Sequence, residues 1–222
     1  MVQTKVIIFG VKDLAQLAKF YLETDSPYQV VAFTVHQQYM PESREYLGLP
    51  VVPFETVEQS FKPSNHKFFA PVTGQRMNKL RESIYLEAKT KGYSFISYVS
   101  SRASIFNTDV GENCFILEDN TIQPFVKIGN NVVIWSGCHI GHHSVLHDHA
   151  FFTSHVVLSG HCIVEPYSWL GVNCTIRDGL TIAESSLIAM GACLTKNSEP
   201  NGVYIGTPAK KIEGKTSLEA NP

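Results

Sequence analysis

The chain has 222 residues, of which 44% are hydrophobic and 17% are charged, as in an ordinary soluble globular protein of one or two domains. The formal net charge of −2 excludes the strongly basic surface of a general nucleic-acid binder and gives no reason to expect a membrane-surface partner. The first residues, MVQTKVIIFG, lack the long apolar centre and cleavage site of a signal peptide, and no stretch approaches the roughly 20 apolar residues that span a bilayer. We therefore expect a cytoplasmic protein.

Residues 1–100 alternate between strand-like and helix-like segments. The run KVIIFG (5–10) is continuously apolar and ends in glycine, which is typical of a buried parallel strand. DLAQLAKFYLE (13–23) repeats its apolar residues at helical spacing, and MNKLRESIYLEAKTKG (77–92) indicates a second helix. Further strands are expected at 29–35, 51–54, 67–72 and 94–99. This rhythm predicts a Rossmann-like α/β domain with a small parallel sheet.

From residue 105 the pattern changes to a repeat of six residues. An apolar residue occupies every sixth position without a slip, at Val110, Ile116, Ile122, Ile128, Ile134, Ile140, Leu146, Phe152, Leu158, Val164, Leu170, Ile176, Ile182, Ile188 and Leu194. A hexapeptide repeat of this length is the signature of a parallel β-helix, in which three six-residue faces form one triangular coil. The fifteen hexapeptides predict about five coils over residues 105–212, followed by a tail at 213–222.

The repeat also predicts which residues are neighbours, because residues 18 apart lie on adjacent coils, about 4.8 Å from each other like neighbouring strands. Cysteines at the small internal position are expected to be reduced core thiols: Cys114, Cys138, Cys162 and Cys174. Cys193 lies off that position and is unexplained. The chain has no CxxC pair, which argues against a zinc knot.

Seven of the nine histidines lie between residues 139 and 161. The 18-residue rule disperses them around the coil, but it stacks His142 on Gly160 and His143 on His161 along one edge. A histidine on a β-helix is most often simply solvated. Three members are therefore expected at the surface or at an interface: His147, His149 and His161.

The repeat, the α/β region before it and the closing segment GVYIGTPAKKI (202–212) together resemble the left-handed β-helix sugar acetyltransferases. This family is typified by sialic-acid O-acetyltransferases and by the bacillosamine-pathway UDP-amino-sugar N-acetyltransferase. The resemblance covers nearly the whole chain and implies a nucleotide-sugar-binding-like domain at 1–100 and a left-handed parallel β-helix acyltransferase domain at 105–212.

The resemblance also implies the reaction and its partners. An acetyl group would pass from acetyl-CoA to an amino or hydroxyl group of a nucleotide-linked sugar, in the synthesis of surface-polysaccharide or glycan precursors. Acetyl-CoA would be a co-substrate, no metal would be needed, and the enzyme would be a homotrimer with each active site between two subunits.

The resemblance assigns the catalytic base to the first histidine of HHSVLH (142–147), which is His142. The next residue in the family is usually an acid that orients the imidazole. Here it is His143, so either His143 takes that role as a neutral acceptor or a carboxylate such as Asp148 reaches the base. The oxyanion donor would be the backbone N–H of Gly160, which the stacking rule independently places beside His142. No cysteine accompanies His142 in a catalytic pattern, so the transfer needs no acyl-enzyme.

Matching positions imply the CoA contacts. Besides Gly160, these are Val172 in GVN (171–173), Met190 in AMGA (189–192), and Lys210 in the tail. The family usually has glycine where Met190 stands.

The acceptor site would involve both halves of the chain. The turn FGVKDLA (9–15) supplies Gly10, Val11 and Lys12, where backbone N–H groups and one positive charge can meet a phosphate at a helix start. This turn has one glycine instead of several, and the acidic pair that often follows the family's second strand is missing from FTVHQQ (33–38). Three further residues are candidates for the acceptor pocket: Trp135, His139 and His155.

Two other functions stay open. The same fold hosts metal-dependent carbonic anhydrases with three histidines drawn from two subunits, and His142 with His147 has their H-x4-H spacing. Those enzymes need a third histidine about two coils earlier, yet none occurs between residues 67 and 138. The second alternative is a non-catalytic scaffold that binds nucleotide sugars.

Overall fold

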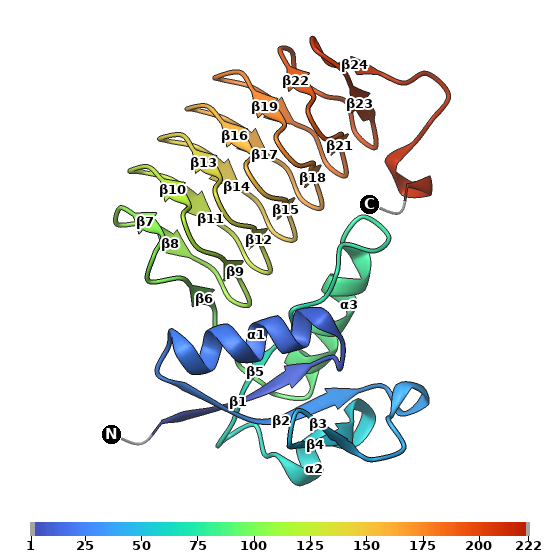
Figure 1. The fold of residues 1–222 in the computed structure, drawn as a ribbon. Coiled ribbons are helices and arrows are strands. Elements are labelled where there is room, and N and C mark those ends of the chain that lie inside the picture. The colour runs from blue at the N-terminus through green and yellow to red at the C-terminus, as the bar shows by residue number, and fades with distance from the viewer. Residues whose placement is uncertain (1–2, 221–222) are drawn as a thin grey trace.

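The computed structural model describes residues 3–220, so the last two residues of the expected tail, 221–222, lie outside the described part. An N-terminal α/β unit packs against one end of a long β-helix, which extends away from it coil by coil (Figure 1). This arrangement confirms the predicted order of an α/β region followed by a β-helix.

The N-terminal sheet has five strands in the order β3-β4-β2-β1-β5, parallel except for the β3–β4 hairpin. Its strands are β1 (Thr4–Phe9), β2 (Tyr28–Val35), β3 (Glu45–Tyr46), β4 (Leu49–Pro53) and β5 (Lys67–Phe69). The helices are α1 (Asp13–Thr24), the one-turn α2 (Val57–Ser60) and α3 (Lys79–Thr90), with 3-10 turns at η1 (Gln37–Tyr39) and η2 (Phe54–Thr56). Both longer helices and four of the five expected strands are confirmed.

The β-helix has three sheets that the chain visits in turn. Sheet I contains β6 (Tyr98–Val99), β9 (Phe115–Ile116), β12 (Val133–Ile134), β15 (Phe151–Phe152), β18 (Trp169–Leu170), β21 (Leu187–Ile188), β23 (Val203–Ile205) and the antiparallel β24 (Lys210–Lys211). Sheet II contains β7 (Ser104–Ile105), β10 (Thr121–Ile122), β13 (His139–Ile140), β16 (Val157–Leu158), β19 (Thr175–Ile176) and β22 (Cys193–Leu194). Sheet III contains β8 (Asp109–Val110), β11 (Lys127–Ile128), β14 (Val145–Leu146), β17 (Ile163–Val164) and β20 (Thr181–Ile182).

The register confirms the 18-residue stacking rule. His139 pairs with Thr121 on one side and with Val157 on the other. The six-spaced apolar residues fill the interior, where all but the partly buried Val110 are 5% exposed or less. The four internal cysteines are buried free thiols, as expected, whereas Cys193 faces outward on sheet II and is half-buried.

The β-helix starts earlier and is longer than the repeat alone indicated. Segment 94–99 was expected to be the last strand of the α/β region. Instead Phe95 makes only an isolated bridge to Phe68, and Tyr98–Val99 pairs with β9 as the first strand of sheet I. Because β6 and β7 precede the fifteen hexapeptides and β23 follows them, the β-helix has six coils and not about five. The short tail ends in the 3-10 turn η3 (Ser217–Glu219), where Ser217 donates to the carbonyl of Ser185.

The two units share a hydrophobic core. Outward-facing aromatic and aliphatic side chains of sheet I, including Phe115, Val133 and Phe151, pack in one cluster with the apolar residues of β1, β2 and α1. The α/β unit therefore covers the first coils on sheet I and leaves the outer faces of sheets II and III free of it.

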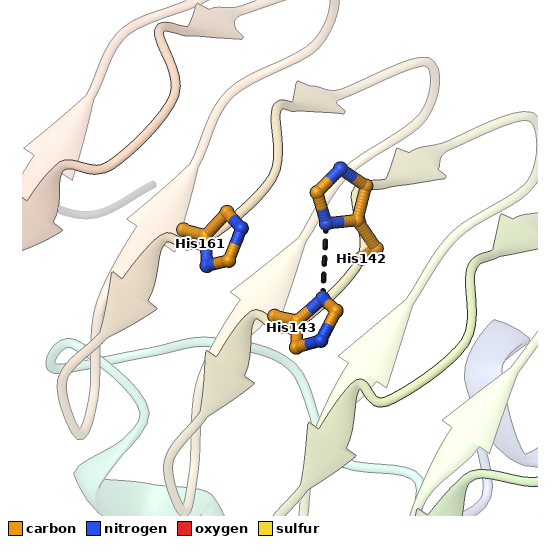
Figure 2. Close-up of side chains that lie close together, drawn as sticks. All are labelled: His142, His143 and His161. Atoms are coloured by element: carbon orange, nitrogen blue, oxygen red, sulfur yellow. Dashed lines mark hydrogen bonds between the residues drawn. The ribbon is translucent and has the colours of Figure 1, made fainter.

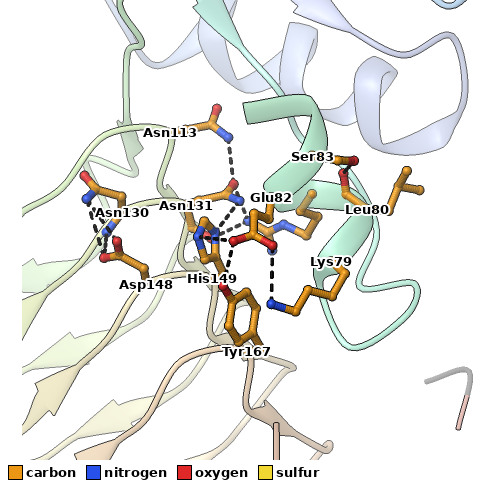
Figure 3. A network of polar contacts seen from close by, with 11 residues as sticks. Lys79, Leu80, Glu82, Ser83, Asn113, Asn130, Asn131, Asp148, His149 and Tyr167 are labelled. Atoms are coloured by element: carbon orange, nitrogen blue, oxygen red, sulfur yellow. Dashed lines mark hydrogen bonds and ion pairs between the residues drawn. The ribbon is translucent and has the colours of Figure 1, made fainter. Parts of the chain in front are cut away.

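A polar ladder forms the second contact between the units, on the corner between sheets III and I (Figure 3). Its members are 18 residues apart and have left-handed backbone angles: Asn113, Asn131, His149 and Tyr167. Asn113 Nδ2 donates to Asn131 Oδ1 at 2.8 Å, and Asn131 Nδ2 lies 2.9 Å from His149 Nδ1. The rings of His149 and Tyr167 stack with centroids 5.1 Å apart.

Helix α3 lies against this ladder. The fully buried Arg81 donates from Nη2 to the carbonyl of Asn131 at 2.6 Å and to its Oδ1 at 3.0 Å. Tyr167 donates its hydroxyl to Glu82 at 2.6 Å. His149 is only 7% exposed, so it lies at the interface between the two units of the chain and not at the outer surface.

Candidate functional site

The corner between sheets II and III carries the predicted base, and we call it the histidine corner. It consists of residues 123–126, 141–144, 159–162 and 177–180 on four successive coils. In each coil the third residue has a left-handed backbone, with φ of 67° at Phe125, 59° at His143, 60° at His161 and 68° at Gly179. This conformation turns the chain from one sheet to the next and projects these side chains outward in a column.

His142 is held at this corner by its backbone and by one ring nitrogen. Its N–H donates to Gln123 Oε1 at 2.9 Å, and its carbonyl accepts from His161 N at 2.9 Å. The imidazole Nδ1 lies 3.0 Å from His143 Nδ1, so one of the two nitrogens donates and the other accepts (Figure 2). The contact with Gln123 was not foreseen, since Gln123 lies 19 residues before His142 and outside the 18-residue rule.

His143 sits in a stack of rings. Its ring is nearly parallel to that of His161, with centroids 4.9 Å apart and an interplanar angle of 12°. Phe125 covers the other side, with a centroid distance of 4.6 Å. Both neighbours are the coil partners at ±18 residues, so the predicted stacking of His143 on His161 is confirmed. Asp148, the alternative partner for the base, instead accepts from Asn130 N at 2.7 Å on another corner.

Gly160 lies directly beneath the His142 ring. A Cβ placed on Gly160 would come 2.8 Å from Cε1 and 3.0 Å from Nε2 of His142, so only glycine leaves room for the imidazole there. Within residues 3–220, no group accepts a hydrogen bond from the Gly160 N–H. His142 and Gly160, the predicted base and donor, are therefore adjacent in the structure.

The remaining acceptor candidates lie elsewhere on the chain. His139 is half-buried on the outer face of sheet II, at β13. His155 is exposed on the corner between sheets I and II, where its ring covers Gly137. Trp135 precedes that corner and packs against the core shared with the α/β unit. Within one chain, neither His155 nor Trp135 reaches the histidine corner.

Of the candidate CoA residues, Gly160 lies at the histidine corner, whereas Val172 and Met190 lie at the corner between sheets I and II. Val172 and Met190 are 18 residues apart on adjacent coils there, and they are 39% and 77% exposed. Lys210 is exposed in β24, next to Lys211, which pairs with Glu199. The width of sheet II separates this corner from His142, so one chain alone does not unite all the candidate residues.

The turn Gly10–Lys12 joins β1 to the start of α1. Gly10 has φ of 115° and donates its N–H to Thr34 O at 2.8 Å, and Lys12 is the residue before the helix. No side chain caps the helix start, so backbone N–H groups of its first turn are open to an anion. The carboxyl ends of adjacent parallel strands are the usual ligand position in an open α/β sheet.

The spacing of His142 and His147 does not form a metal site in one chain. His142 precedes β14 at the histidine corner, and His147 follows β14 at the next corner. A different trio does converge: ligand nitrogens of His142, His143 and His161 all lie within 4.8 Å of one another, and all three side chains are exposed. The 18-residue rule places all three histidines along one edge, but it does not predict that their ring nitrogens converge.

No helix within residues 3–220 has the length and apolar character needed to cross a bilayer.

Comparison with known proteins agrees with this architecture. The family described as bacterial transferase hexapeptide (six repeats) matches residues 107–142 and 126–160. Galactoside O-acetyltransferase of Escherichia coli is 27% identical over 114 residues, covering 48% of this chain and 53% of that protein. Gamma carbonic anhydrase 2 of Arabidopsis thaliana is 28% identical over 131 residues, covering 53% of this chain and 40% of that protein. The chain thus spans about half the length, or less, of these curated relatives.

Solved structures match over nearly the whole chain. The acetyltransferase domain of PglB from Neisseria gonorrhoeae in complex with acetyl coenzyme A has a TM-score of 0.83 at 16% identity, covering 95% of this chain and 100% of that one. A perosamine N-acetyltransferase variant from Caulobacter crescentus, in complex with CoA and GDP-perosamine, has a TM-score of 0.71 at 20% identity, covering 95% and 98%. The chain therefore carries the bacterial transferase hexapeptide repeat and has the left-handed β-helix fold of these acetyltransferases.

Proposed function

We propose that this chain transfers an acetyl group from acetyl-CoA to an amino or hydroxyl group of a nucleotide-linked sugar, with His142 as the general base. The observation that carries the proposal is the position of the His142 ring over Gly160, whose N–H donates to no group within residues 3–220. Two supporting facts come from relatives of the same fold: one binds acetyl coenzyme A, and another binds CoA together with GDP-perosamine.

The proposed reaction proceeds without a covalent enzyme intermediate. The sugar nucleophile attacks the thioester carbonyl carbon while His142 Nε2 accepts its proton, which is typically worth about 10²–10⁴-fold in rate. The Gly160 N–H donates to the oxyanion that develops on the carbonyl oxygen, an effect on the order of 3 kcal/mol. Collapse of the tetrahedral intermediate breaks the C–S bond, and His142 returns the proton to the CoA thiolate.

His143 orients the base in this scheme. For Nε2 to accept a proton, His142 carries its own proton on Nδ1 and donates it to His143 Nδ1, 3.0 Å away. His143 is then a neutral acceptor in place of the acid that the family resemblance suggests. A neutral acceptor stabilises the imidazolium less than a carboxylate does, because hydrogen bonds to charged groups are about twice as strong.

A homotrimer would complete the site. The histidine corner and the corner with Val172 and Met190 lie on opposite sides of sheet II, so contact between two copies would bring them together. Exposed apolar side chains on and beside sheet II fit such a contact, among them Phe125 at 67%, Val157 at 39% and Met190 at 77% exposure. Light scattering measures the subunit number. Mixing inactive His142→Ala subunits with Val172→Glu subunits should then restore part of the activity.

The α/β unit would hold the nucleotide of the acceptor. The phosphates would meet the open N–H groups after Gly10 and the charge of Lys12. The proposal places the protein in the cytoplasm, where acetyl-CoA and nucleotide sugars are made, and its five free thiols suit that reducing compartment.

The test is an incubation of the protein with acetyl-CoA and a panel of nucleotide-linked amino sugars, nucleotide-linked neutral sugars and free sugars. We expect one class of acceptor to gain a single acetyl group by mass spectrometry, with one CoA released per product. The acetylated position decides between N- and O-transfer. Binding of a nucleotide sugar without any transfer would favour the scaffold alternative, and metal-dependent hydration of CO₂ would favour the carbonic anhydrase alternative.

A further inference from the structure

The histidine corner contains three imidazoles that face one another. His142 Nδ1 and His143 Nδ1 are 3.0 Å apart, and one nitrogen of each of the three rings lies within 4.8 Å of the others. The ring of His161 is edge-on to that of His142, with centroids 5.0 Å apart and an interplanar angle of 87°. Figure 2 shows the three rings around a common space, and all three side chains are exposed.

The backbone explains why these rings meet. His143 and His161 are coil partners whose left-handed backbone angles of 59° and 60° project both side chains outward in the same direction. His142 precedes His143, and its carbonyl is tied to His161 N at 2.9 Å. All three histidines are therefore fixed at their Cα atoms by the β-helix, and only side-chain rotations of the exposed rings are needed to optimise their geometry.

We propose that His142, His143 and His161 form a binding site for one divalent transition-metal ion of the zinc class, and that its occupancy switches off the base. Zinc binds histidine nitrogens at about 2.0–2.1 Å, which places two nitrogens of a tetrahedral site roughly 3.3 Å apart. The Nδ1 atoms of His142 and His143 are already close to this separation, and the ring of His161, stacked on His143 at an interplanar angle of 12°, must rotate to direct a nitrogen toward the same ion. Three neutral imidazoles favour zinc, copper or nickel over magnesium or calcium, which prefer oxygen ligands.

The effect on catalysis follows from the tautomer, and this part rests on the proposed function. A metal bound to His142 Nδ1 takes the lone pair of that nitrogen, so the proton of the neutral ring resides on Nε2. The Nε2–H group cannot accept the proton of a sugar nucleophile. The hydrogen bond between the Nδ1 atoms of His142 and His143 is also lost, because the proton on His142 Nδ1 has moved to Nε2 of the same ring. Metal binding therefore inhibits acetyl transfer reversibly, with no covalent change.

The binding is tested first, without any substrate. Co²⁺ is titrated into the metal-free protein and its visible d–d absorption is recorded, and Zn²⁺ is measured by calorimetry and by competition with Co²⁺. We expect one ion per chain and at least a tenfold weaker affinity in His161→Ala. The matched control is His147→Ala, which removes a half-buried histidine of the next corner and should leave the affinity unchanged.

The inhibition is tested separately with the acceptor identified for the wild type. Product is quantified by chromatography, because the CoA thiol itself binds zinc. Zn²⁺ should inhibit the wild type and a chelator should restore the rate, whereas His161→Ala should keep its rate at the zinc concentration that inhibits the wild type.

Two results would overturn the inference. Either no ion binds, or the ion binds equally well to His161→Ala. If the protein binds Co²⁺ through this trio but acetylates no sugar, the proposed acetyl transfer fails while the metal site stands. If it acetylates a sugar at a rate that Zn²⁺ does not change, the proposed inhibition by metal fails and the proposed acetyl transfer stands.

Discussion

Replacing Gly160 with alanine should lower the rate of acetyl transfer while leaving the fold intact. The φ angle of Gly160 lies outside the left-handed region, so alanine strains no backbone there. Its Cβ, however, would lie 2.8 Å from Cε1, 3.0 Å from Nε2 and 3.2 Å from Nδ1 of His142, all below the 3.4 Å of ordinary contact. The imidazole is exposed and must therefore rotate or shift away from the place where the proton is transferred.

The size of the effect follows from that displacement. A misplacement of a catalytic group by about 1 Å can lower the rate about 10²-fold, and the His142 ring must move at least about half that far to clear the new Cβ. We expect kcat to fall by roughly tenfold to 10²-fold, equivalent to about 1.4–2.7 kcal/mol in activation free energy. Steady-state kinetics with the identified acceptor measures kcat, and a thermal melt should show an unchanged or slightly higher Tm, because Gly→Ala restricts the unfolded chain.

Gly179→Ala is the matched control on the next coil of the same corner. A Cβ on Gly179 meets nothing within 4 Å, but its φ of 68° is unfavourable for alanine by about 1–2 kcal/mol. This variant should lose thermal stability and keep its kcat, the reverse of Gly160→Ala. An unchanged kcat in Gly160→Ala, or an equal loss in both variants, would refute the placement of His142 over Gly160 as the catalytic geometry.

Three further predictions concern the histidine corner and the polar ladder. His143→Ala should lower kcat about tenfold with little change in KM, because the Nδ1–H of His142 loses its acceptor. His143→Asp should restore or raise the rate, and equal kcat values in wild type and both variants would contradict the orienting role. Asn131→Ala should lower the free energy of unfolding by about 3–5 kcal/mol, because the buried Arg81 loses one of its two acceptors and Asn113 and His149 each lose a partner. A loss below 1 kcal/mol in chemical denaturation would show that the hydrogen bonds of the ladder contribute little to stability. Burial lowers the pKa of His149 below its usual 6.5, so the unfolded chain binds more protons and the free energy of unfolding decreases as the pH falls below that value. His149→Gln should make the free energy of unfolding depend less on pH between pH 5 and 7. An unchanged dependence would count against a neutral buried imidazole.

The β-helix was largely predictable because its repeat specifies both burial and neighbours. Each hexapeptide contributes one inward-facing apolar residue such as Phe152 or Leu158. The 18-residue period also specifies the register in which each strand pairs with the strand on the next coil. The stacking of His143 on His161 and the placement of residues 142 and 160 side by side on adjacent coils followed from the 18-residue period alone. The strand at Tyr98–Val99 was assigned to the α/β region and Val203–Ile205 was not expected to be a strand, because both segments lie outside the unbroken run of hexapeptides.

Contacts between the two units could not be read from the repeat. Arg81 looks like an ordinary helical cation in the sequence, yet it is fully buried against Asn131, and only the docking of α3 on the β-helix makes this visible. Trp135 stays a candidate for the acceptor pocket, and within one chain its partly buried ring packs against the core that the α/β unit shares with sheet I. The repeat predicts which residues are neighbours along the β-helix, whereas the contacts of Arg81 and Trp135 depend on how the α/β unit packs against sheet I.

The side-chain geometry of the histidine corner was also beyond the sequence. The 18-residue rule gives the column of Phe125, His143 and His161, but not the rotation that turns the His142 ring toward His143 and over Gly160. That rotation brings together the proposed base, its proposed acceptor and the proposed oxyanion donor, and it also places His142 within reach of the other two histidines of the proposed metal site.

The role of His142 as general base is tested by comparing the kcat of wild type and His142→Asn on the identified acceptor, with acetyl-CoA affinity measured in parallel by calorimetry. We expect kcat to fall at least about 10²-fold at an unchanged acetyl-CoA affinity and Tm, because only the proton acceptor is removed. A rate within twofold of the wild type would contradict it and would place the base at another residue.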